Sequence, residues 1–154
     1  MANVEIIRVG PAEYGLVCDL YNAVFRPPQD AGYFERRLAN RANLVMVAEL
    51  ERRPVGFQCS YELRPTTFYN WLTGVLPDAR RMGVASQLIA AEHAWARARG
   101  YEMSRLECYN QSRAMLSLAI RHGYDIVGIR WDSHTSGNLI IFEKTIESAE
   151  PPPE

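Results

Sequence analysis

Cysteine is scarce in this sequence, and its spacing suits neither a cross-link nor a metal site. The 154 residues include three cysteines, Cys18, Cys59 and Cys108, which lie far apart in the chain. An odd number of cysteines, without a Cys-x-x-Cys pair or a histidine at metal-ligand spacing, argues against a disulfide framework and against zinc. We therefore expect no disulfide and no metal.

Long apolar runs and an excess of one charge are also missing. No stretch approaches the roughly 20 apolar residues of a membrane-spanning helix, and no apolar segment follows a basic one at the N-terminus as in a secretory signal. The formal net charge is −1, with 23% charged and 47% hydrophobic residues. This balance is that of a soluble globular protein and gives no reason to bind nucleic acid or a membrane surface. Together with the absence of a signal, a spanning segment and a disulfide pattern, it predicts a cytoplasmic protein.

One segment, Val-Leu-Pro-Asp-Ala-Arg-Arg-Met-Gly-Val-Ala at residues 75–85, joins a predicted strand to a predicted helix. The preceding residues 67–74 are rich in β-branched and aromatic residues, and residues 86–99 carry apolar side chains at helical spacing. Unpaired N–H groups and the helix dipole favour anions at such a helix start. Gly83 admits a ligand close to the backbone, and Arg80 and Arg81 add positive charge. The segment predicts a diphosphate site, with a solvated loop as the alternative.

Two common phosphate motifs do not fit this segment. A P-loop ends in Gly-Lys-Ser/Thr, whereas Gly83 is followed by Val84 and Ala85. A dinucleotide fingerprint needs three glycines and an acidic residue about 20 positions further on, and the glycines are absent.

The pattern Val75-x-Pro77-x-x-Arg80-x-x-Gly83-x-Ala85 instead resembles the acetyl-coenzyme A signature of the GNAT acyltransferase superfamily. A second segment, from Asn110 to Gly123-Tyr124, resembles the other cofactor segment of that superfamily, in which an Asn follows a strand and Gly-Phe/Tyr opens the next one. The resemblance covers residues 44–146. It implies acetyl-coenzyme A as the acyl donor, held by Val75, Leu76, Arg80, Arg81, Met82, Gly83, Val84, Ala85, Ser86, Asn110 and Arg113.

The predicted elements agree with a mixed α+β fold. We expect strands at 4–8, 44–50, 55–63, 67–74, 103–109, 125–131 and 139–145, with hairpin turns at 51–54 and 64–66. Helices are expected from Pro11 to Val24, from Asp30 to about Ala39, at 86–99, and from Ser112 to about Arg121. The helix at 86–99 must be a crossover, so its flanking strands should be parallel. From the resemblance, we expect about seven mostly antiparallel strands, one splayed parallel pair and about four helices, in one domain over residues 1–147 with a disordered tail at 148–154.

The catalytic groups are less clear than the cofactor site. Acyl transfer to an amine needs a base for the amine, an N–H donor for the developing oxyanion and a proton for the leaving thiolate. The resemblance implies that the N–H of Val75 faces the oxyanion. In many relatives a Tyr that protonates the leaving thiolate stands where this chain has Ala119. In some, a Glu that acts as the base stands where it has Tyr69. The candidate substitutes are Glu62 as a base through water, Tyr69, and Tyr109 as an acid.

Other side chains have weaker arguments. We expect Glu107 to be surface-exposed or ion-paired, and Cys108 has no base near it that would make it a nucleophile. From the resemblance, the acceptor site involves the segments 25–30 and 132–138, and its tentative residues are Phe25, Arg26, Trp71, Trp131 and His134. Packing in the core explains the aromatic ones equally well.

Together these patterns predict an enzyme that transfers an acetyl group from acetyl-coenzyme A to a primary amine, by direct attack in a ternary complex. The acceptor is a small molecule or a protein amine. The alternative is a catalytically weak coenzyme A-binding regulatory module. The resemblance also implies a homodimer.

Overall fold

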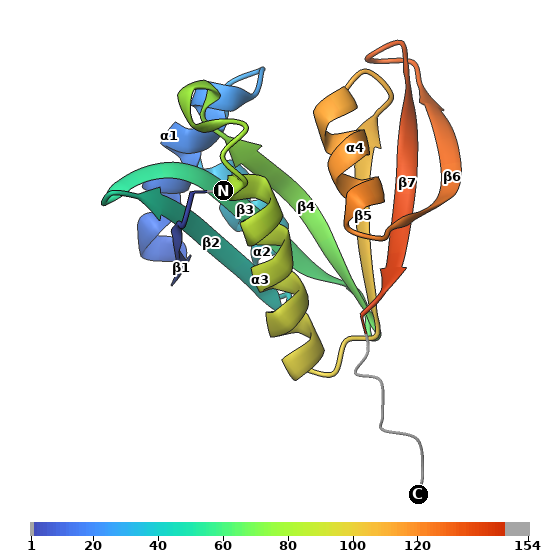
Figure 1. Ribbon diagram of the computed structural model, residues 1–154, viewed down its shortest axis with the longest axis horizontal. Helices are drawn as coiled ribbons and strands as arrows, with labels where there is room; N and C mark the ends of the chain where they lie inside the picture. The colour runs from blue at the N-terminus through green and yellow to red at the C-terminus, as the bar shows by residue number, and fades with distance from the viewer. Residues whose placement is uncertain (1, 147–154) are drawn as a thin grey trace, which may run out of the picture. The chain divides into compact units, whose positions relative to one another are not determined.

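The computed structural model describes residues 2–146, which form seven strands and four α-helices (Figure 1). The strands are β1 (Glu5–Val9), β2 (Asn43–Leu50), β3 (Arg53–Arg64), β4 (Thr67–Val75), β5 (Met103–Tyr109), β6 (Asp125–Asp132) and β7 (Gly137–Thr145). The helices are α1 (Tyr14–Val24), α2 (Ala31–Leu38), α3 (Val84–Ala98) and α4 (Arg113–Arg121), and the short 3₁₀ turns are η1 (Pro11–Glu13) and η2 (Pro77–Ala79).

The sheet order confirms the predicted fold class. The strands are arranged β1-β2-β3-β4-β5-β7-β6, and β4 and β5 form the one parallel pair. The described chain divides into two compact units, one of residues 2–62 and Asn70–Glu92, the other of Leu63–Tyr69 and residues 93–146. The predicted splay of β4 and β5 concerns the placement of these units and stays a prediction. The predicted tail lies outside the described residues.

Several expected boundaries were wrong by one to three residues, and three of the differences have a clear local cause. The helix predicted at 86–99 begins at Val84, because Gly83, at φ 80°, already turns the chain into the helix. The hairpin predicted at 51–54 is a two-residue turn, since Glu51 and Arg52 both have positive φ and Arg53 already belongs to β3. Pro11 starts a 3₁₀ turn, and α1 follows it.

The predicted caps at Asp30, Gly100 and Gly123 and the predicted end of α1 are confirmed, whereas Ser112, before α4, makes no side-chain capping hydrogen bond. The side chain of Asp30 accepts a hydrogen bond from the Tyr33 N–H at 3.1 Å, which caps α2. Gly100 and Gly123, which follow α3 and α4, have φ of 87° and 84°. Helix α1 ends at Val24, before the two prolines.

In the first unit, helices cover both faces of β3. Phe57 packs against Tyr21 of α1, with ring centroids 6.3 Å apart, whereas a side chain at its neighbour Gly56 would meet Val84 and Leu88 of α3. Alternate residues of a strand point to opposite faces, so α1 and α3 lie on opposite sides, as Figure 1 shows. The buried core on the α1 side also contains Phe34.

The second unit is built on the strands β5, β7 and β6. Leu106 of β5 lies opposite Phe142 of β7, and both are buried. Phe68 at the start of β4 packs against Trp95 of α3 and Tyr101, at centroid distances of 5.3 and 4.8 Å. These contacts give the unit its own apolar core.

Candidate active site

At the end of β4, both the N–H and the carbonyl of one peptide group are hydrogen-bonded. The N–H of Leu76 donates to the Val55 carbonyl at 2.8 Å, and the carbonyl of Val75 accepts from Arg80 Nε at 3.2 Å. The peptide between Val75 and Leu76 is thereby fixed, and the chain then turns through η2 into the arginine pair.

The turn into α3 has the geometry of an anion cradle. Arg81 and Gly83 have φ of 64° and 80°, the left-handed region that favours glycine. The first helical bond runs from the Gln87 N–H to the Gly83 carbonyl at 3.1 Å. Among the described residues, the N–H groups of Val84 and Ala85 have no backbone acceptor. Donors of this kind can bind an anion, and the diphosphate site predicted from the sequence stays a prediction.

Close packing fixes the first turn of α3 against the sheet. Val84 and Leu88 are buried, and a Cβ added to Gly56 would lie 3.0 Å from a methyl carbon of Val84 and 3.1 Å from the Gly74 carbonyl. Because Gly56 has no side chain, β3 can approach the start of α3 closely. This close packing fixes the position of the unpaired N–H groups.

The charges around the turn come from three arginines. Arg80 and Arg81 are exposed, so they are free to face a ligand's phosphates. Arg53 binds both carboxylate oxygens of Asp78 at 3.0 and 2.8 Å, which ties the β2–β3 hairpin to η2. Sequence analysis missed this pair, because it joins residues 25 positions apart.

Gln87 is a second contact that sequence analysis missed. Its Nε2 donates to the Ala2 carbonyl at 2.7 Å and to the Gly83 carbonyl at 3.2 Å, and its Oε1 accepts from the Val4 N–H at 3.3 Å. The Ala2 N–H donates to the Met82 carbonyl at 3.1 Å. The N-terminal segment therefore lies along the turn at residues 75–85 between β4 and α3, which is the predicted cofactor turn.

The other two predicted cofactor residues, Asn110 and Arg113, belong to the second unit. The Asn110 N–H donates to the Asn138 carbonyl at 2.8 Å, and Arg113 is the exposed first residue of α4. A part for their side chains in binding the cofactor stays a prediction.

Tyr109 makes a specific contact at the end of β5. Its hydroxyl donates to Asp132 Oδ2 at 2.6 Å, and the His134 N–H donates to Asp132 Oδ1 at 2.9 Å. The hydrogen bond to Asp132, followed by burial, raises the pKa of Tyr109, and the same bond, with that from His134, lowers the pKa of Asp132. Sequence analysis did not identify Asp132, although its place at the end of β6 was a usable signal.

The two remaining catalytic candidates lie in different units. Glu62 is half-buried near the end of β3, and its N–H donates to the Ala42 carbonyl at 2.9 Å. Tyr69, also half-buried, belongs to the second unit. Their pairing stays a prediction.

Of the acceptor-site candidates, Phe25 and Trp71 belong to one aromatic cluster. Phe25 contacts Tyr21 and Phe57, and Trp71 contacts Tyr33, Phe34 and Tyr61, with centroid distances of 5.0–6.3 Å. Both side chains are only half-buried, so they retain a surface for a substrate.

The other three acceptor-site candidates are exposed. The Arg26 guanidinium donates to the Asn22 and Phe25 carbonyls at the end of α1. Trp131 and His134 are exposed in the second unit.

Two minor candidates have structural roles. Glu107 accepts two hydrogen bonds from Arg105, at 2.9 and 3.1 Å, which agrees with the expected ion pair. Cys108 is buried, and burial raises the pKa of its thiol to about 11. A thiol of that pKa is a poor nucleophile at neutral pH.

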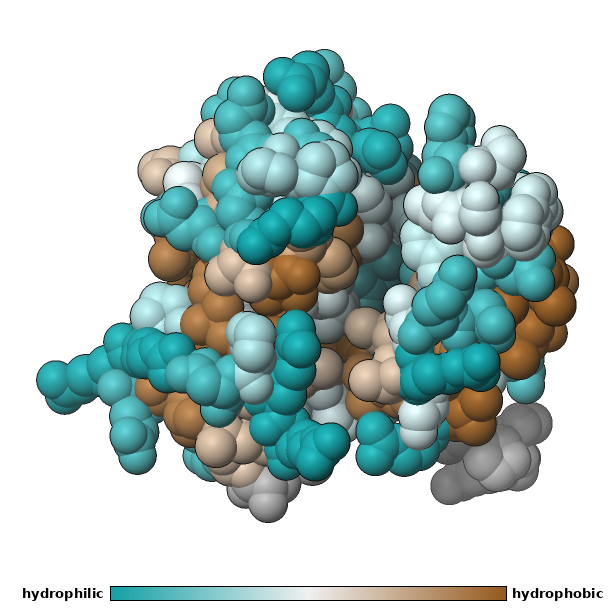
Figure 2. Space-filling model, turned by 90° about the horizontal axis from the view of Figure 1, so that it is seen from above, coloured by the Kyte–Doolittle hydropathy of each residue, from teal (hydrophilic) through white to brown (hydrophobic). Residues whose placement is uncertain are grey.

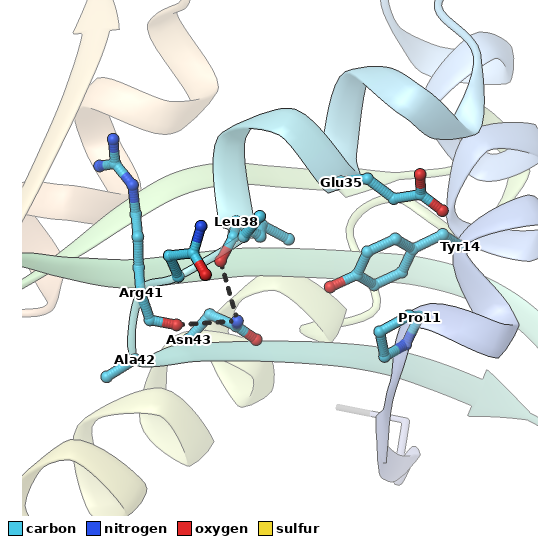
Figure 3. A pocket seen from close by; sticks show the side chains of 9 residues that line it. Pro11, Tyr14, Glu35, Leu38, Arg41, Ala42 and Asn43 are labelled. Carbon is cyan, nitrogen blue, oxygen red and sulfur yellow. Dashed lines mark hydrogen bonds between the residues drawn. The ribbon is translucent and has the colours of Figure 1, made fainter.

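A separate hollow of about 500 Å³ lies beside α2 in the first unit (Figure 3). Asn43 lines it, and its Nδ2 donates to the Leu38 and Arg41 carbonyls at 3.3 and 3.1 Å. Its lining residues are Pro11, Tyr14, Glu35 and the segment 38–43, so none of the predicted site residues lies there. It is distinct from the cofactor turn.

In residues 2–146, no cluster of three or more His, Cys, Asp or Glu side chains could hold a metal ion. Across the same residues, every helix is too short or too polar to span a membrane.

Several solved structures of N-acetyltransferases have the same fold as this chain. The ribosomal-protein-S18-alanine N-acetyltransferase of Escherichia coli is 16% identical, covers 99% of each chain and has a TM-score of 0.85. Ard1 of Thermoplasma volcanium is 19% identical over 94% of this chain and 99% of its own, with a TM-score of 0.80. The structure of yncA from Salmonella typhimurium, with its cofactor acetyl-CoA, is 16% identical over 99% of each chain, with a TM-score of 0.75.

A search of curated proteins gave no match. The model of the acetyltransferase (GNAT) family, however, matches residues 15–124, most of the described chain. This match spans the cofactor turn, both cofactor segments and all four helices except the first residue of α1. The chain therefore belongs to the GNAT acetyltransferase family, whose acyl donor is acetyl-coenzyme A.

Proposed function

We propose that residues 1–147 form one cytoplasmic acetyltransferase domain that acetylates a primary amine by direct attack on the thioester in a ternary complex. The observation that carries this proposal is the turn between β4 and α3. It combines left-handed Arg81 and Gly83 with the unpaired N–H groups of Val84 and Ala85. A backbone cradle of this kind suits a diphosphate, and the arginines beside it supply the counter-charge.

The residues of the turn fit the cofactor that the family uses. The N–H groups of Val84 and Ala85, with Arg80 and Arg81, would hold the phosphates, and Asn110 and Arg113 would hold the other parts of the molecule. When bound, acetyl-coenzyme A supplies an activated acyl group, so the enzyme needs no nucleophile of its own.

The N–H of Val75 is the proposed donor to the developing oxyanion. Its neighbouring peptide is fixed by the Val55 carbonyl and by Arg80. A donor that is already oriented stabilises charge in the transition state without reorganising.

Proton transfer is assigned to Glu62, Tyr69 and Tyr109. Glu62 would take a proton from the acceptor ammonium through water. Tyr109 would protonate the leaving thiolate. Its hydroxyl donates to Asp132 Oδ2 at 2.6 Å, so this hydrogen bond would have to break before the proton moves to the thiolate.

The acceptor site is proposed to include Phe25, Arg26, Trp71, Trp131 and His134. The exposed edges of the aromatic side chains would bind the apolar part of a small-molecule or protein amine. The E. coli structure that the chain resembles acts on a ribosomal protein, which supports testing a peptide N-terminus as an acceptor.

A coenzyme A-binding module without efficient catalysis is the second candidate. Where many relatives carry the Tyr that protonates the leaving thiolate, this chain has Ala119, which is fully buried. No hydroxyl group can act from there.

Measuring thioester consumption against a panel of small amines, lysine peptides and peptide N-termini separates the two candidates. We expect turnover with at least one primary amine and none with its N-methylated tertiary analogue. Cofactor binding by calorimetry without turnover on any acceptor would favour the module, and absence of binding would overturn both.

A further inference from the structure

The hollow beside α2 contains hydrogen-bonding groups that have no partner among the described residues. It is formed by the start of α1, the end of α2 and the loop that leads into β2 (Figure 3). On the face that Figure 2 shows, hydrophilic and hydrophobic residues are interspersed, as is usual on a protein surface. The hollow differs because two of its polar side chains point into it unpaired, which is an arrangement that a bound molecule can satisfy.

Tyr14 supplies the first of these groups. The residue is only 4% exposed, and its ring packs against Phe34 at a centroid distance of 6.5 Å. Figure 3 shows the ring reaching into the hollow, with its hydroxyl directed toward the side on which Asn43 lies. Within residues 2–146, this hydroxyl makes no hydrogen bond. Because the rest of the side chain is enclosed by the protein, the hydroxyl can be satisfied only from the hollow.

Asn43 supplies the second group. Its Nδ2 donates to two carbonyls, those of Leu38 and Arg41. These contacts fix the orientation of the amide, because a carbonyl cannot accept a hydrogen bond from Oδ1. In Figure 3, Oδ1 therefore points the other way, toward Tyr14. Nothing in the described part of the chain donates to this oxygen, so it is left to accept an N–H or O–H of a ligand.

Charged side chains of opposite sign lie on two sides of the hollow. Figure 3 shows Glu35 on the side of Tyr14 and Arg41 on the other side. Both are exposed, and within residues 2–146 neither forms a salt bridge, with the other or with a third residue. The Arg41 guanidinium lies over the ring of Tyr61, 4.7 Å from its centroid, and this contact holds it in place.

We propose that the hollow binds a small zwitterion, which carries an ammonium group at one end and a carboxylate at the other. The ammonium lies between the Tyr14 hydroxyl oxygen, Asn43 Oδ1 and the Glu35 carboxylate, so its three N–H donors have three acceptors. The carboxylate pairs with Arg41, whose planar guanidinium suits two parallel hydrogen bonds. The carbon atoms between the two charged groups contact the apolar part of the lining, which is Pro11, Leu38, Ala39 and Ala42.

The surroundings favour a molecule with both charges. Helix α2 ends at Leu38, a lining residue, and the partial negative charge of a helix C-terminus favours an ammonium group there. Burial raises the pKa of Tyr14, and the charges of Cys59 and Glu35 raise it further, so its hydroxyl is neutral. Glu35 and Arg41 then give the hollow one charge of each sign. A simple amine leaves Arg41 unpaired, and a simple carboxylate leaves Glu35 unpaired.

Amide NMR spectra of the full chain, recorded without acetyl-coenzyme A, test the site and its location. The probes are glycine, β-alanine, γ-aminobutyrate and ε-aminohexanoate, which differ in the separation of their charges. At least one of them should shift the side-chain amide of Asn43 and the backbone amides of residues 39–43, and leave residues 83–87 of the cofactor turn unchanged. The amine and the carboxylate of the same length should each bind about fivefold more weakly or worse, because each lacks one ion pair.

Variants of the hollow complete the test. Tyr14→Phe keeps the ring that packs on Phe34 and removes the hydroxyl, so the affinity for the best probe should fall about fivefold. Glu35→Gln and Arg41→Gln should each lower it about three- to fivefold. Asp19→Asn is the control, because Asp19 is exposed on α1 and does not line the hollow, and it should leave the affinity unchanged.

Several outcomes would overturn the proposal. They are the absence of shifts at residues 39–43 with every probe, shifts confined to the cofactor turn or to the acceptor segment 25–30, and equal binding of the singly charged analogues. An affinity that the three variants leave unchanged, or that the control lowers as much, would also overturn it. Circular dichroism checks that each variant folds. Acetyl transfer is measured separately, so a failure here leaves the proposed function standing.

Discussion

The two compact units differ in how completely they pair their polar groups, and the change falls between two consecutive residues of α3. In the first unit, buried Glu92 accepts a hydrogen bond from Gln58 Nε2, which also donates to Ser60 at 3.1 Å. Glu92 Oε1 and Gln58 Oε1 are buried with no partner among the described residues. In the second unit, buried His93 contacts the Tyr124 hydroxyl at 2.7 Å, and that hydroxyl contacts Ser104 at 2.6 Å.

Glu92 and His93 are both uncharged because they are buried, so what separates them is whether their polar atoms have partners. Burial raises the pKa of Glu92 to about 8 and lowers the pKa of His93 to about 4, so both are neutral at pH 7. An unpaired buried group costs about 1–3 kcal/mol, and that cost falls on the first unit. The same unit carries the unpaired N–H groups of Val84 and Ala85. Unused hydrogen-bonding capacity is therefore found in the same unit as the turn at which the cofactor is proposed to bind.

The largest effect is expected at the cofactor turn. Gly83→Val should reduce acetyl-coenzyme A affinity at least about a hundredfold, because a β-branched side chain resists φ of 80° and crowds the cradle. Isothermal titration calorimetry measures the affinity. Gly100→Val is the matched control, since Gly100 has φ of 87° with open space around it. It should lose similar stability and keep full affinity; equal losses of affinity in both variants would mean that the turn is not the site.

Glu62→Gln tests whether the first unit also supplies the base. Turnover should fall about a hundredfold, the lower end for general acid–base assistance, with cofactor affinity unchanged. The rising limb of the pH–rate profile should disappear. Glu107→Gln is the control, because Glu107 is held by Arg105 at 2.9 Å, and it should change turnover little. A Glu62 variant with full activity at every pH would clear that residue.

Glu92→Gln tests how buried Glu92 makes the stability of the first unit depend on pH. The unfolded carboxyl loses its proton near pH 4.5, whereas the folded one keeps it to about pH 8. The free energy of unfolding should therefore fall as pH rises through this window, by up to about 1.4 kcal/mol per pH unit. Urea denaturation between pH 6.5 and 8.5 should show this slope in the native chain and lose it in the variant. A slope that persists in the variant would assign it to another group.

His93 should respond to pH in the opposite direction. The unfolded imidazole gains a proton below about pH 6.5, whereas the folded one resists protonation to about pH 4. Its contribution to stability is therefore lost as pH falls, below the window used for Glu92.

The smallest of these effects is expected at Tyr124. Tyr124→Phe removes the hydroxyl shared by His93 and Ser104 and leaves both buried groups with one partner fewer. The free energy of unfolding should fall by about 1–3 kcal/mol, measured by urea denaturation at pH 7. Ser104→Ala removes only one contact of the cluster and should cost less. A Tyr124→Phe variant as stable as the native chain would show that the second cluster is no better paired than the first.

Local signals in the sequence were enough to predict most of the fold. Asp30, the prolines after Phe25, and the glycines at 100 and 123 each fix a helix end through their own backbone or side-chain chemistry. The cofactor turn was predictable for the same reason. Its function depends on consecutive residues, so their spacing in the chain is the spacing that matters.

Contacts between distant residues could not be predicted. Glu92 and His93 lie on the buried side of α3, between Ile89 and Ala96, but their polar side chains hide that position from a pattern of apolar residues. Asp132 reaches Tyr109 only through the register of β5, β7 and β6. The catalytic groups were hard to predict for the same reason, because Glu62 and Tyr69 belong to different units.

The way in which Gln87 holds the N-terminal segment has a consequence for sequence variation. Gln87 contacts the carbonyl of Ala2 and the N–H of Val4, and Met82 contacts the N–H of Ala2. All of these are backbone atoms, which every residue except proline provides. Side chains at positions 2–4 can therefore change with little effect on the turn, whereas inserting or deleting a single residue there shifts every contact at once. Related enzymes that share this contact should vary in the identity of these residues and agree in their number.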